Sequence, residues 1–205
     1  QVPFSYLDVR LTPQAIEATL VLHIYDAAHD LDIAPIERLL DPGFARSQQA
    51  AISRLVRDRL RLRVDGQLLQ AAWAGVEVLT DRQSLRLELR EPLPRPAATL
   101  LVEGTLFPYD PEHKTFLNVY EGAALTQVIL DSGRARFEHF SGSRQGVVAV
   151  VRTFVPAGLH HIAIGPDHLL FLVGLLLLGG TLRRLALIVT AFTLAHSLTL
   201  SLAAL

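Results

Sequence analysis

Two patterns of hydrophobic residues divide this chain. Residues 1–145 contain short runs in which apolar and polar residues alternate, as they do in strands with one buried face. Residues 159–205 instead contain long apolar runs with few polar interruptions. We therefore predict a β domain at 1–145, a linker or interfacial segment at 146–158 and a helical membrane part at 159–205.

The alternating runs predict the strands of the first domain. In residues 59–64 every second residue is apolar, and the Asp65-Gly66 pair that follows is a strong signal for a tight hairpin. Strands are expected at 5–12, 15–26, 59–64, 67–79, 84–90, 98–107 and 125–130, with a further candidate at 134–140. Six to eight short antiparallel strands separated by turn signals indicate a mainly β soluble domain, an antiparallel β-sandwich.

A helical excursion interrupts the strands between residues 31 and 58. Residues 33–40 have the apolar spacing of a short helix. Pro42-Gly43 predicts a turn, and Ser47 is placed to cap a second helix that runs to about Arg57.

The apolar C-terminal region predicts a transmembrane hairpin. The segments 159–180 and 182–205 are each long enough to span a bilayer, which takes roughly 20 residues. The break between them is too short for anything but a tight turn, and it carries Arg183 and Arg184. Because short loops rich in arginine stay on the cytoplasmic side, residues 1–155 are expected in the periplasm and the hairpin in the bacterial cytoplasmic (inner) membrane.

Ionisable residues within the apolar segments are the main functional clue. His161, Asp167, His168 and His196 lie there, and a charged group at the bilayer centre costs at least about 2.5 kcal/mol, so such groups usually mark an ion or substrate path. His168 and His196 are each 12 residues from the polar break, so two antiparallel helices would place both at one depth, roughly 18 Å from the turn. Imidazole and carboxylate groups without sulfur suit nickel, cobalt, zinc or iron. A purely structural bridge between the helices is the alternative.

These segments also carry a family resemblance. The sequence H-I-A-I-G-P-D-H at 161–168, the run LLFLVGLLLL after it and TAFTLAHSLTL in the second segment resemble the HupE/UreJ membrane proteins, closest to the branch with a large extracytoplasmic domain. The resemblance implies a nickel or cobalt permease linked to hydrogenase and urease maturation. It also implies that His161, Asp167, His168 and His196 handle the metal, and that 159–205 begins a longer helical bundle.

Composition excludes several function classes. A net charge of −1 and a near-neutral pI give no basic patch for nucleic acid. The chain has no cysteine, so it has neither disulfides nor a thiolate metal site. It contains neither H-E-x-x-H nor G-x-S-x-G, and we do not expect an enzyme. It also contains no methionine, so we expect a chain that is either processed at its N-terminus, for example by removal of a signal peptide, or a fragment.

Two clusters in the β domain are weaker candidates for metal capture. They group histidines with carboxylates: His23, His29, Asp26 and Asp30 in one, and His113, Asp110 and Glu112 in the other. The simpler interpretation of Tyr109-Asp110-Pro111 is a turn, and Trp73 is expected in the core.

The sequence supports two functional hypotheses. The first is membrane transport of a divalent transition-metal ion, nickel or cobalt with zinc left open, with the β domain presenting or gating the ion. The ion would be cargo, and no tightly bound cofactor is expected. The second is a non-catalytic accessory or assembly subunit of a larger membrane complex, anchored by the hairpin and docking through its β-sandwich. The expected partners are the lipid bilayer and other membrane subunits or further copies of the chain.

Overall fold

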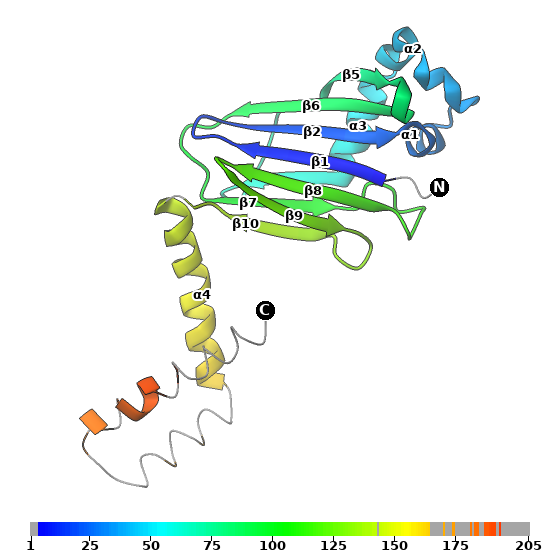
Figure 1. Ribbon diagram of the computed structural model, residues 1–205. Coiled ribbons are helices and arrows are strands. Elements are labelled where there is room, and N and C mark those ends of the chain that lie inside the picture. The colour runs from blue at the N-terminus through cyan, green and yellow to red at the C-terminus, as the bar shows by residue number, and fades with distance from the viewer. Residues whose placement is uncertain are drawn as a thin grey trace. The chain divides into compact units, whose positions relative to one another are not determined.

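The computed structural model describes residues 4–142 and 144–164, together with residues 170, 174, 181, 183–184, 187–191 and 193 (Figure 1). The chain divides into two compact units, Gln1–Val151 and Arg152–Leu205. All the described strands lie in the first unit.

The secondary structure of the described residues is mainly β. The strands are β1 (Phe4–Leu11), β2 (Ala15–His23), β3 (Leu60–Val64), β4 (Gln67–Leu68), β5 (Ala74–Leu79), β6 (Ser84–Pro92), β7 (Thr99–Gly104), β8 (Lys114–Glu121), β9 (Ala124–Leu130) and β10 (Arg136–Phe140). The helices are α1 (Ile24–Asp30), α2 (Pro42–Ser47), α3 (Gln49–Arg59) and α4 (Arg144–Ile164), with short 3-10 helices η1 (Ile36–Leu40) and η2 (Thr80–Arg82).

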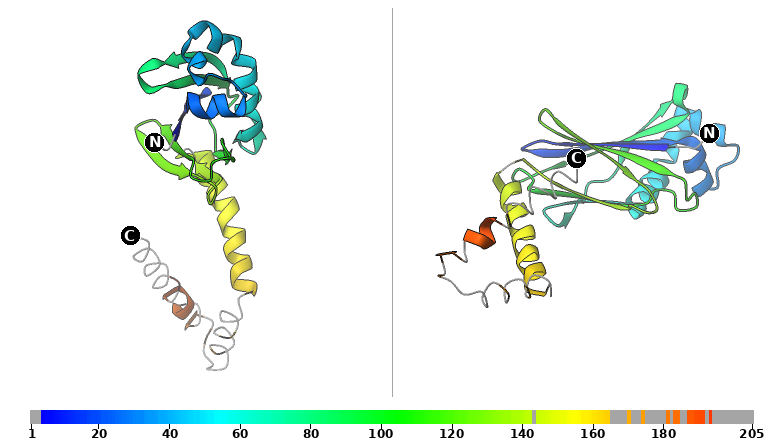
Figure 2. Two further views of the ribbon diagram at one scale, coloured as in Figure 1. Left: turned by 90° about the vertical axis from the view of Figure 1, so that its right-hand side faces the viewer. Right: turned by 60° about the horizontal axis from the view of Figure 1, so that its bottom comes forward.

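The strands form two sheets. One has six strands in the order β5-β6-β2-β1-β8-β9, and the other has four in the order β10-β7-β3-β4. The sheets lie one over the other, and α1, α2 and α3 gather at one end of them (Figures 1 and 2). The predicted mainly β domain with a helical excursion is therefore confirmed, with one correction: β1 pairs with β8 in parallel, so the larger sheet is not wholly antiparallel.

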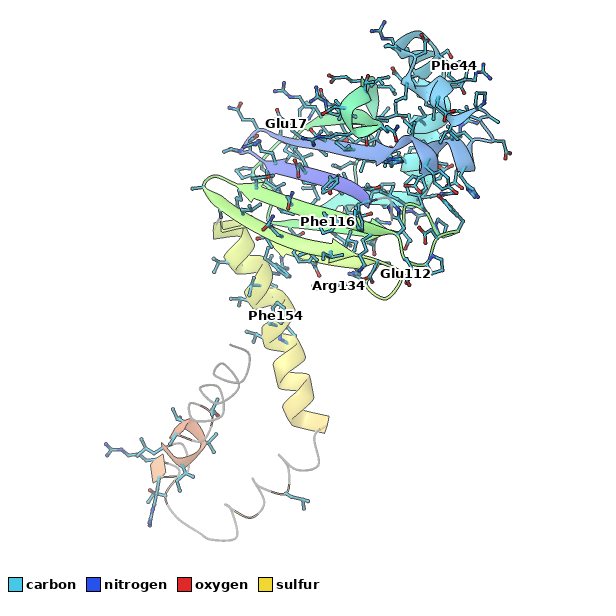
Figure 3. The ribbon with its side chains drawn as sticks, turned by 45° about the vertical axis from the view of Figure 1, so that its right-hand side comes forward. Glu17, Phe44, Glu112, Phe116, Arg134 and Phe154 are labelled. Carbon is cyan, nitrogen blue, oxygen red and sulfur yellow. The ribbon has the colours of Figure 1, made fainter. Side chains whose placement is uncertain are left out.

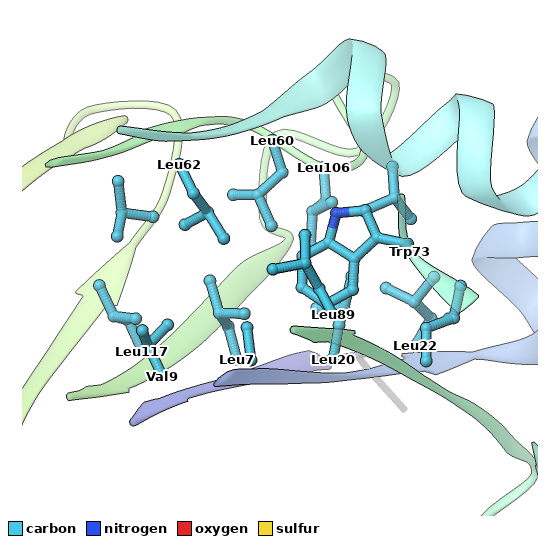
Figure 4. Packing of buried hydrophobic residues seen from close by; sticks show 14 of the residues in the cluster. Leu7, Val9, Leu20, Leu22, Leu60, Leu62, Trp73, Leu89, Leu106 and Leu117 are labelled. Atoms are coloured by element: carbon cyan, nitrogen blue, oxygen red, sulfur yellow. The ribbon is translucent and has the colours of Figure 1, made fainter. Parts of the chain in front are cut away.

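The core fills the space between the two sheets. Leu60 and Leu62 of β3 are each 3% exposed, and they face Leu7 and Val9 of β1, which are fully buried (Figure 4). Trp73 lies in the same cluster, as predicted. Each such leucine removed from water stabilises the fold by about 1.5–3 kcal/mol, so the alternation of apolar residues that predicts the strands also supplies the force that joins the sheets.

The predicted return strand at 67–79 is wrong in its middle. The hairpin at Asp65-Gly66 forms with positive φ at both residues, 50° and 81°, as a two-residue turn of this type requires. The return strand β4 nevertheless ends after two residues. The backbone N–H groups of Gln70 and Ala71 donate to the Glu91 carboxylate at 2.6 and 2.7 Å, which draws the chain away from β3 and across to the other sheet, where it continues as β5.

Strand β8 was not predicted. Its inward positions alternate in the usual way, with Leu117 and Val119 buried. Its outward positions include the aromatic Phe116, which stacks on Tyr6 of β1 at 5.3 Å and meets Phe4 edge-on at 5.4 Å (Figure 3). Aromatic residues on the outer face weaken the contrast between apolar and polar positions on which the prediction depends.

Two helices begin at residues that were predicted as strand or turn, and a capping interaction accounts for each difference. Residues 24–26, predicted as strand, begin α1, because the His23 ring Nδ1 accepts the Tyr25 N–H at 3.2 Å. Pro42 starts α2 rather than a turn, with the Asp41 carboxylate accepting the Phe44 N–H at 2.6 Å.

The second predicted helix is present as α3, but its predicted cap is wrong. Ser47 closes the preceding helix, with its hydroxyl donating to the Phe44 carbonyl at 2.6 Å. The cap position of α3 is Gln48, which makes no side-chain capping bond.

Residues 146–158, predicted as a linker or interfacial segment, lie within α4. The helix continues through Pro156, which has no N–H to offer the carbonyl of Arg152. Val147, Val148 and Phe154 of this helix are each more than half exposed, and Figure 3 labels Phe154 on it. Among the described residues, no helix combines the length and hydropathy that a membrane crossing needs. Apart from 159–164 at the end of α4 and the few residues named above, the predicted spans lie outside the described residues.

Gly104 on β7 lies in close contact with the backbone of Arg59, and this contact generates a prediction. Its φ is +144°, and a Cβ at this position would lie 1.9 Å from the Arg59 carbonyl oxygen. Gly104→Ala should therefore lower the free energy of unfolding by about 3 kcal/mol, because both the strain and the displaced backbone are costly. Urea unfolding followed by circular dichroism measures this.

Gly122→Ala is the matched control, because Gly122 also has positive φ, 58°, but open space around the added methyl. It should cost about 1 kcal/mol. Equal effects of the two substitutions would contradict the steric explanation.

Candidate functional site

A buried polar cluster joins three segments at one end of the sandwich. Ser5 comes from the start of β1, Asp26 from the first turn of α1, and Tyr109 and His113 from the loop between β7 and β8. Ser5 and Asp26 are fully buried, and His113 is 2% exposed. Such groups are costly to bury unless they bond to one another, so their arrangement decides what the cluster can do.

The four side chains form an ordered chain of contacts. The Ser5 hydroxyl lies 3.1 Å from His113 Nε2, and His113 Nδ1 lies 3.7 Å from Asp26 Oδ2. The Tyr109 hydroxyl donates to the other Asp26 oxygen, Oδ1, at 2.5 Å. With the imidazole proton on Nδ1, the ring accepts from Ser5 and turns its N–H toward the carboxylate; this tautomer is assigned from the contacts.

Two side-chain atoms of this cluster have no hydrogen-bond partner among the described residues. They are Asp26 Oδ2 and His113 Nδ1, which face each other at a distance too long for a hydrogen bond. Burial raises the pKa of Asp26, although the Tyr109 hydrogen bond opposes this, as does His113 when its ring is protonated. Burial lowers the pKa of His113, with Asp26 and Asp110 acting in the opposite direction. Burial and the bond to Asp26 together raise the pKa of Tyr109.

Local packing holds the loop and α1 against the cluster. The ring of His29 stacks on that of Tyr109 at 3.7 Å, and Phe107 packs edge-on to His113 at 4.9 Å. Asp30, one turn after Asp26, forms an ion pair with Arg59, whose guanidinium also donates to the Leu106 carbonyl at 2.7 Å. These contacts fix the loop on both sides of Tyr109.

The order Ser5–His113–Asp26 is that of a hydrolase triad, but its surroundings are not. A nucleophilic serine must meet its substrate, and Ser5 has no exposed surface. The cluster is therefore best described as an internal polar network that ties β1, α1 and the β7–β8 loop together.

The two histidine and carboxylate clusters that the sequence suggested for metal capture lie partly side by side in the structure, but their side chains are not arranged as metal ligands. Asp26, His29 and Asp30 lie in the same network as His113, whereas His23 caps α1 instead. Within the part of the chain that the structure describes, no three histidine, aspartate or glutamate side chains are arranged to hold a metal ion. The predicted turn at Tyr109-Asp110-Pro111 is confirmed by the bond from the His113 N–H to the Asp110 carbonyl and by a second from Asp110 to Phe107.

Sequence reasoning missed Ser5 and Tyr109 as members of the network. Ser5 shares the inward register of β1 with Leu7, Val9 and Leu11, and a polar residue in an otherwise apolar inward row is a signal that a buried partner exists.

The four predicted metal ligands lie in or after α4. The backbone of His161 belongs to the last turns of α4. Asp167, His168 and His196 lie outside the described residues, so the predicted ligand set stays a prediction. Nearby, the Arg184 N–H donates to the Thr181 carbonyl at 2.9 Å, a local turn at the polar break expected between the two apolar segments.

The buried imidazole generates a pH prediction. His113 should remain neutral at pH 6.5, the usual histidine pKa, because burial lowers its own. Since the unfolded chain then binds the proton more readily than the folded chain, this histidine should reduce stability as the pH falls below about 6.5. NMR of the ring nitrogens measures the pKa and the tautomer, and we expect the proton on Nδ1.

Asp26→Asn provides the test of cause, because it keeps the shape of the side chain and removes its charge. The substitution should lower the pKa of His113 further, since the Asp26 carboxylate favours the charged imidazole. An unchanged or higher pKa in the variant, or a proton on Nε2 in the wild type, would show that the two groups are not coupled.

The C-terminal part of the chain is similar to a known protein family. The model of the HupE / UreJ protein family matches residues 139–205. No curated protein matches the chain. The matched stretch contains His161, Asp167, His168 and His196, so the resemblance seen in the sequence is confirmed for residues 139–205.

Proposed function

We propose that this protein moves a divalent transition-metal ion, nickel or cobalt, across the bacterial inner membrane. The HupE/UreJ family is linked to nickel and cobalt transport and is typically membrane-associated. The observation that carries the proposal is the position of the family match, because it covers all four candidate ligands, His161, Asp167, His168 and His196.

The chemistry of these residues fits a transported ion. Two imidazoles that the sequence spacing predicts at one depth, with a neighbouring carboxylate, offer nitrogen and oxygen ligands, which suit Ni²⁺ and Co²⁺ and do not exclude Zn²⁺. A transporter must release its ion, so a weak and incompletely filled site is expected, in contrast to a closed structural zinc site. The ion would pass between His161, Asp167, His168 and His196 by exchange of ligands.

The β domain would lie on the periplasmic side and present or gate the ion. This orientation rests on Arg183 and Arg184 in the short break, which favour the cytoplasmic side. Both arginine side chains are exposed.

Metal binding by the longest native form of the protein in detergent tests the proposal. Calorimetric titration with nickel, cobalt and zinc should show binding to the wild type. His168→Ala and His196→Ala should each weaken it by more than about a hundredfold, because loss of a direct ligand costs more than loss of a supporting group.

His160→Ala is the matched control, because it removes a neighbouring histidine that is not in the predicted ligand set. It should bind metal like the wild type. If no metal binds, or if His160→Ala weakens binding as much as His168→Ala, the transport proposal fails and the accessory-subunit hypothesis replaces it.

A further inference from the structure

A cavity of about 550 Å³ opens between two helices and the segment that enters β5. Its walls come from α2, α3 and residues 72–74, at the helical end of the sandwich (Figure 1). The lining residues are Arg46, Ser47, Gln49, Ala50, Ser53, Arg54, Arg57, Ala72, Trp73 and Ala74. The volume lies within the usual range of small-molecule sites, about 300–1,000 Å³.

One face of α3 supplies most of the wall. Ala50, Ser53, Arg54 and Arg57 are spaced at i, i+3, i+4 and i+7, so their side chains leave the helix on the same side. Arg46 in the last turn of α2 adds a third arginine. Two arginines of α3 and one of α2 therefore line the same cavity.

The three arginines of this cavity carry uncompensated charge. Some arginines elsewhere in the β domain are neutralised, as Arg59 is by Asp30 and Arg86 by Glu77, whereas others such as Arg61 form no ion pair with a described residue; what distinguishes the cavity is that three such arginines line it together. None of Arg46, Arg54 and Arg57 forms an ion pair with a described residue, and no carboxylate lines the cavity. Like charges gathered in a concave surface raise the local positive potential, which a bound anion would relieve.

The remaining lining groups fit an organic anion of small size. Guanidinium groups bind carboxylate and phosphate oxygens through paired N–H donors. The Ser53 hydroxyl and the Gln49 amide add neutral donors, and Ala50, Ala72 and Ala74 give apolar contact.

We propose that this cavity is a binding site for a small oxyanion with two or more negative charges, either a polycarboxylate or a phosphate compound. Arg46, Arg54 and Arg57 hold its charged groups, and Ser53 and Gln49 orient it. The site lies in the β domain and goes beyond the proposed metal transport.

The only tryptophan of the chain provides the readout. Trp73 lines the cavity, while its side chain is 3% exposed and packs in the core (Figure 4). Titration of the full chain in neutral detergent with citrate, and separately with inorganic phosphate, should produce a saturable change in tryptophan fluorescence. The affinity should fall as salt is added, because exposed charges are screened.

Arginine substitutions test the assignment. Arg46→Gln, Arg54→Gln and Arg57→Gln should each weaken binding by about tenfold or more, and the triple variant should not bind, because each removes a charged hydrogen-bond donor. These side chains are exposed, so thermal unfolding by circular dichroism should be unchanged. Arg61→Gln is the matched control: Arg61 is exposed on β3, forms no ion pair with a described residue and lies outside the cavity.

A second arm separates the two sources of such an anion. Vesicles of phosphatidylcholine with phosphatidylglycerol present a lipid phosphate, and vesicles of phosphatidylcholine alone are the control. Binding of citrate or phosphate that depends on the three arginines supports a free ligand, and arginine-dependent binding of anionic vesicles alone assigns the oxyanion to a lipid headgroup. The proposal is overturned if no probe binds, or if Arg61→Gln weakens binding as much as the cavity variants. His168→Ala should leave anion binding unchanged, which keeps this result separate from metal transport.

Discussion

The parallel pairing of β1 with β8 is the contact on which the arrangement of the β domain depends. It places β1 in the interior of the six-stranded sheet, with Ser5 opposite Thr115 and Leu7 opposite Leu117. Because β2 runs antiparallel to β1 and β8 runs parallel to it, the end of β2, the start of β1 and the start of β8 lie at the same end of the sheet. This is why α1, which follows β2, and the loop that precedes β8 can share one buried network with the beginning of β1.

That network shows how a domain of this size uses polar groups in its interior. The Tyr109 hydroxyl and the Asp26 carboxylate are 83 residues apart in sequence, and their contact closes a long loop. The apolar core between the sheets is non-directional and would tolerate small shifts of one sheet over the other. A short hydrogen bond between buried groups tolerates much less, so Asp26, Tyr109 and His113 add geometric specificity to an interface that leucine packing alone would leave broad.

Local pattern in the sequence was enough to predict strands such as β1, β3 and β6, because their alternation of leucine or valine with charged residues records burial residue by residue. It was not enough for β8, whose outer face carries Phe116, nor for the pairing of β8 with a strand more than a hundred residues earlier. The metal-handling candidates could be proposed from sequence because charged groups in an apolar run stand out. The polar network could not, since Asp26 and His113 belong to separate clusters that only the sheet topology brings together.

The arginine cavity could be predicted only in part. The spacing of Arg54 and Arg57 on one helix face is visible in the sequence, whereas the opposing wall at Trp73 depends on the chain crossing between sheets.

That crossing also affects how the domain meets other proteins. By accepting the N–H groups of Gln70 and Ala71, the Glu91 carboxylate ends β4 after two residues, and β4 is the edge of the smaller sheet. A long exposed edge strand is a template for pairing with another chain, and very short edge strands are one of the ways in which β proteins avoid it. A single partly exposed carboxylate thus shortens the edge strand with which another chain could pair, and this disfavours intermolecular strand addition on this side of the sandwich.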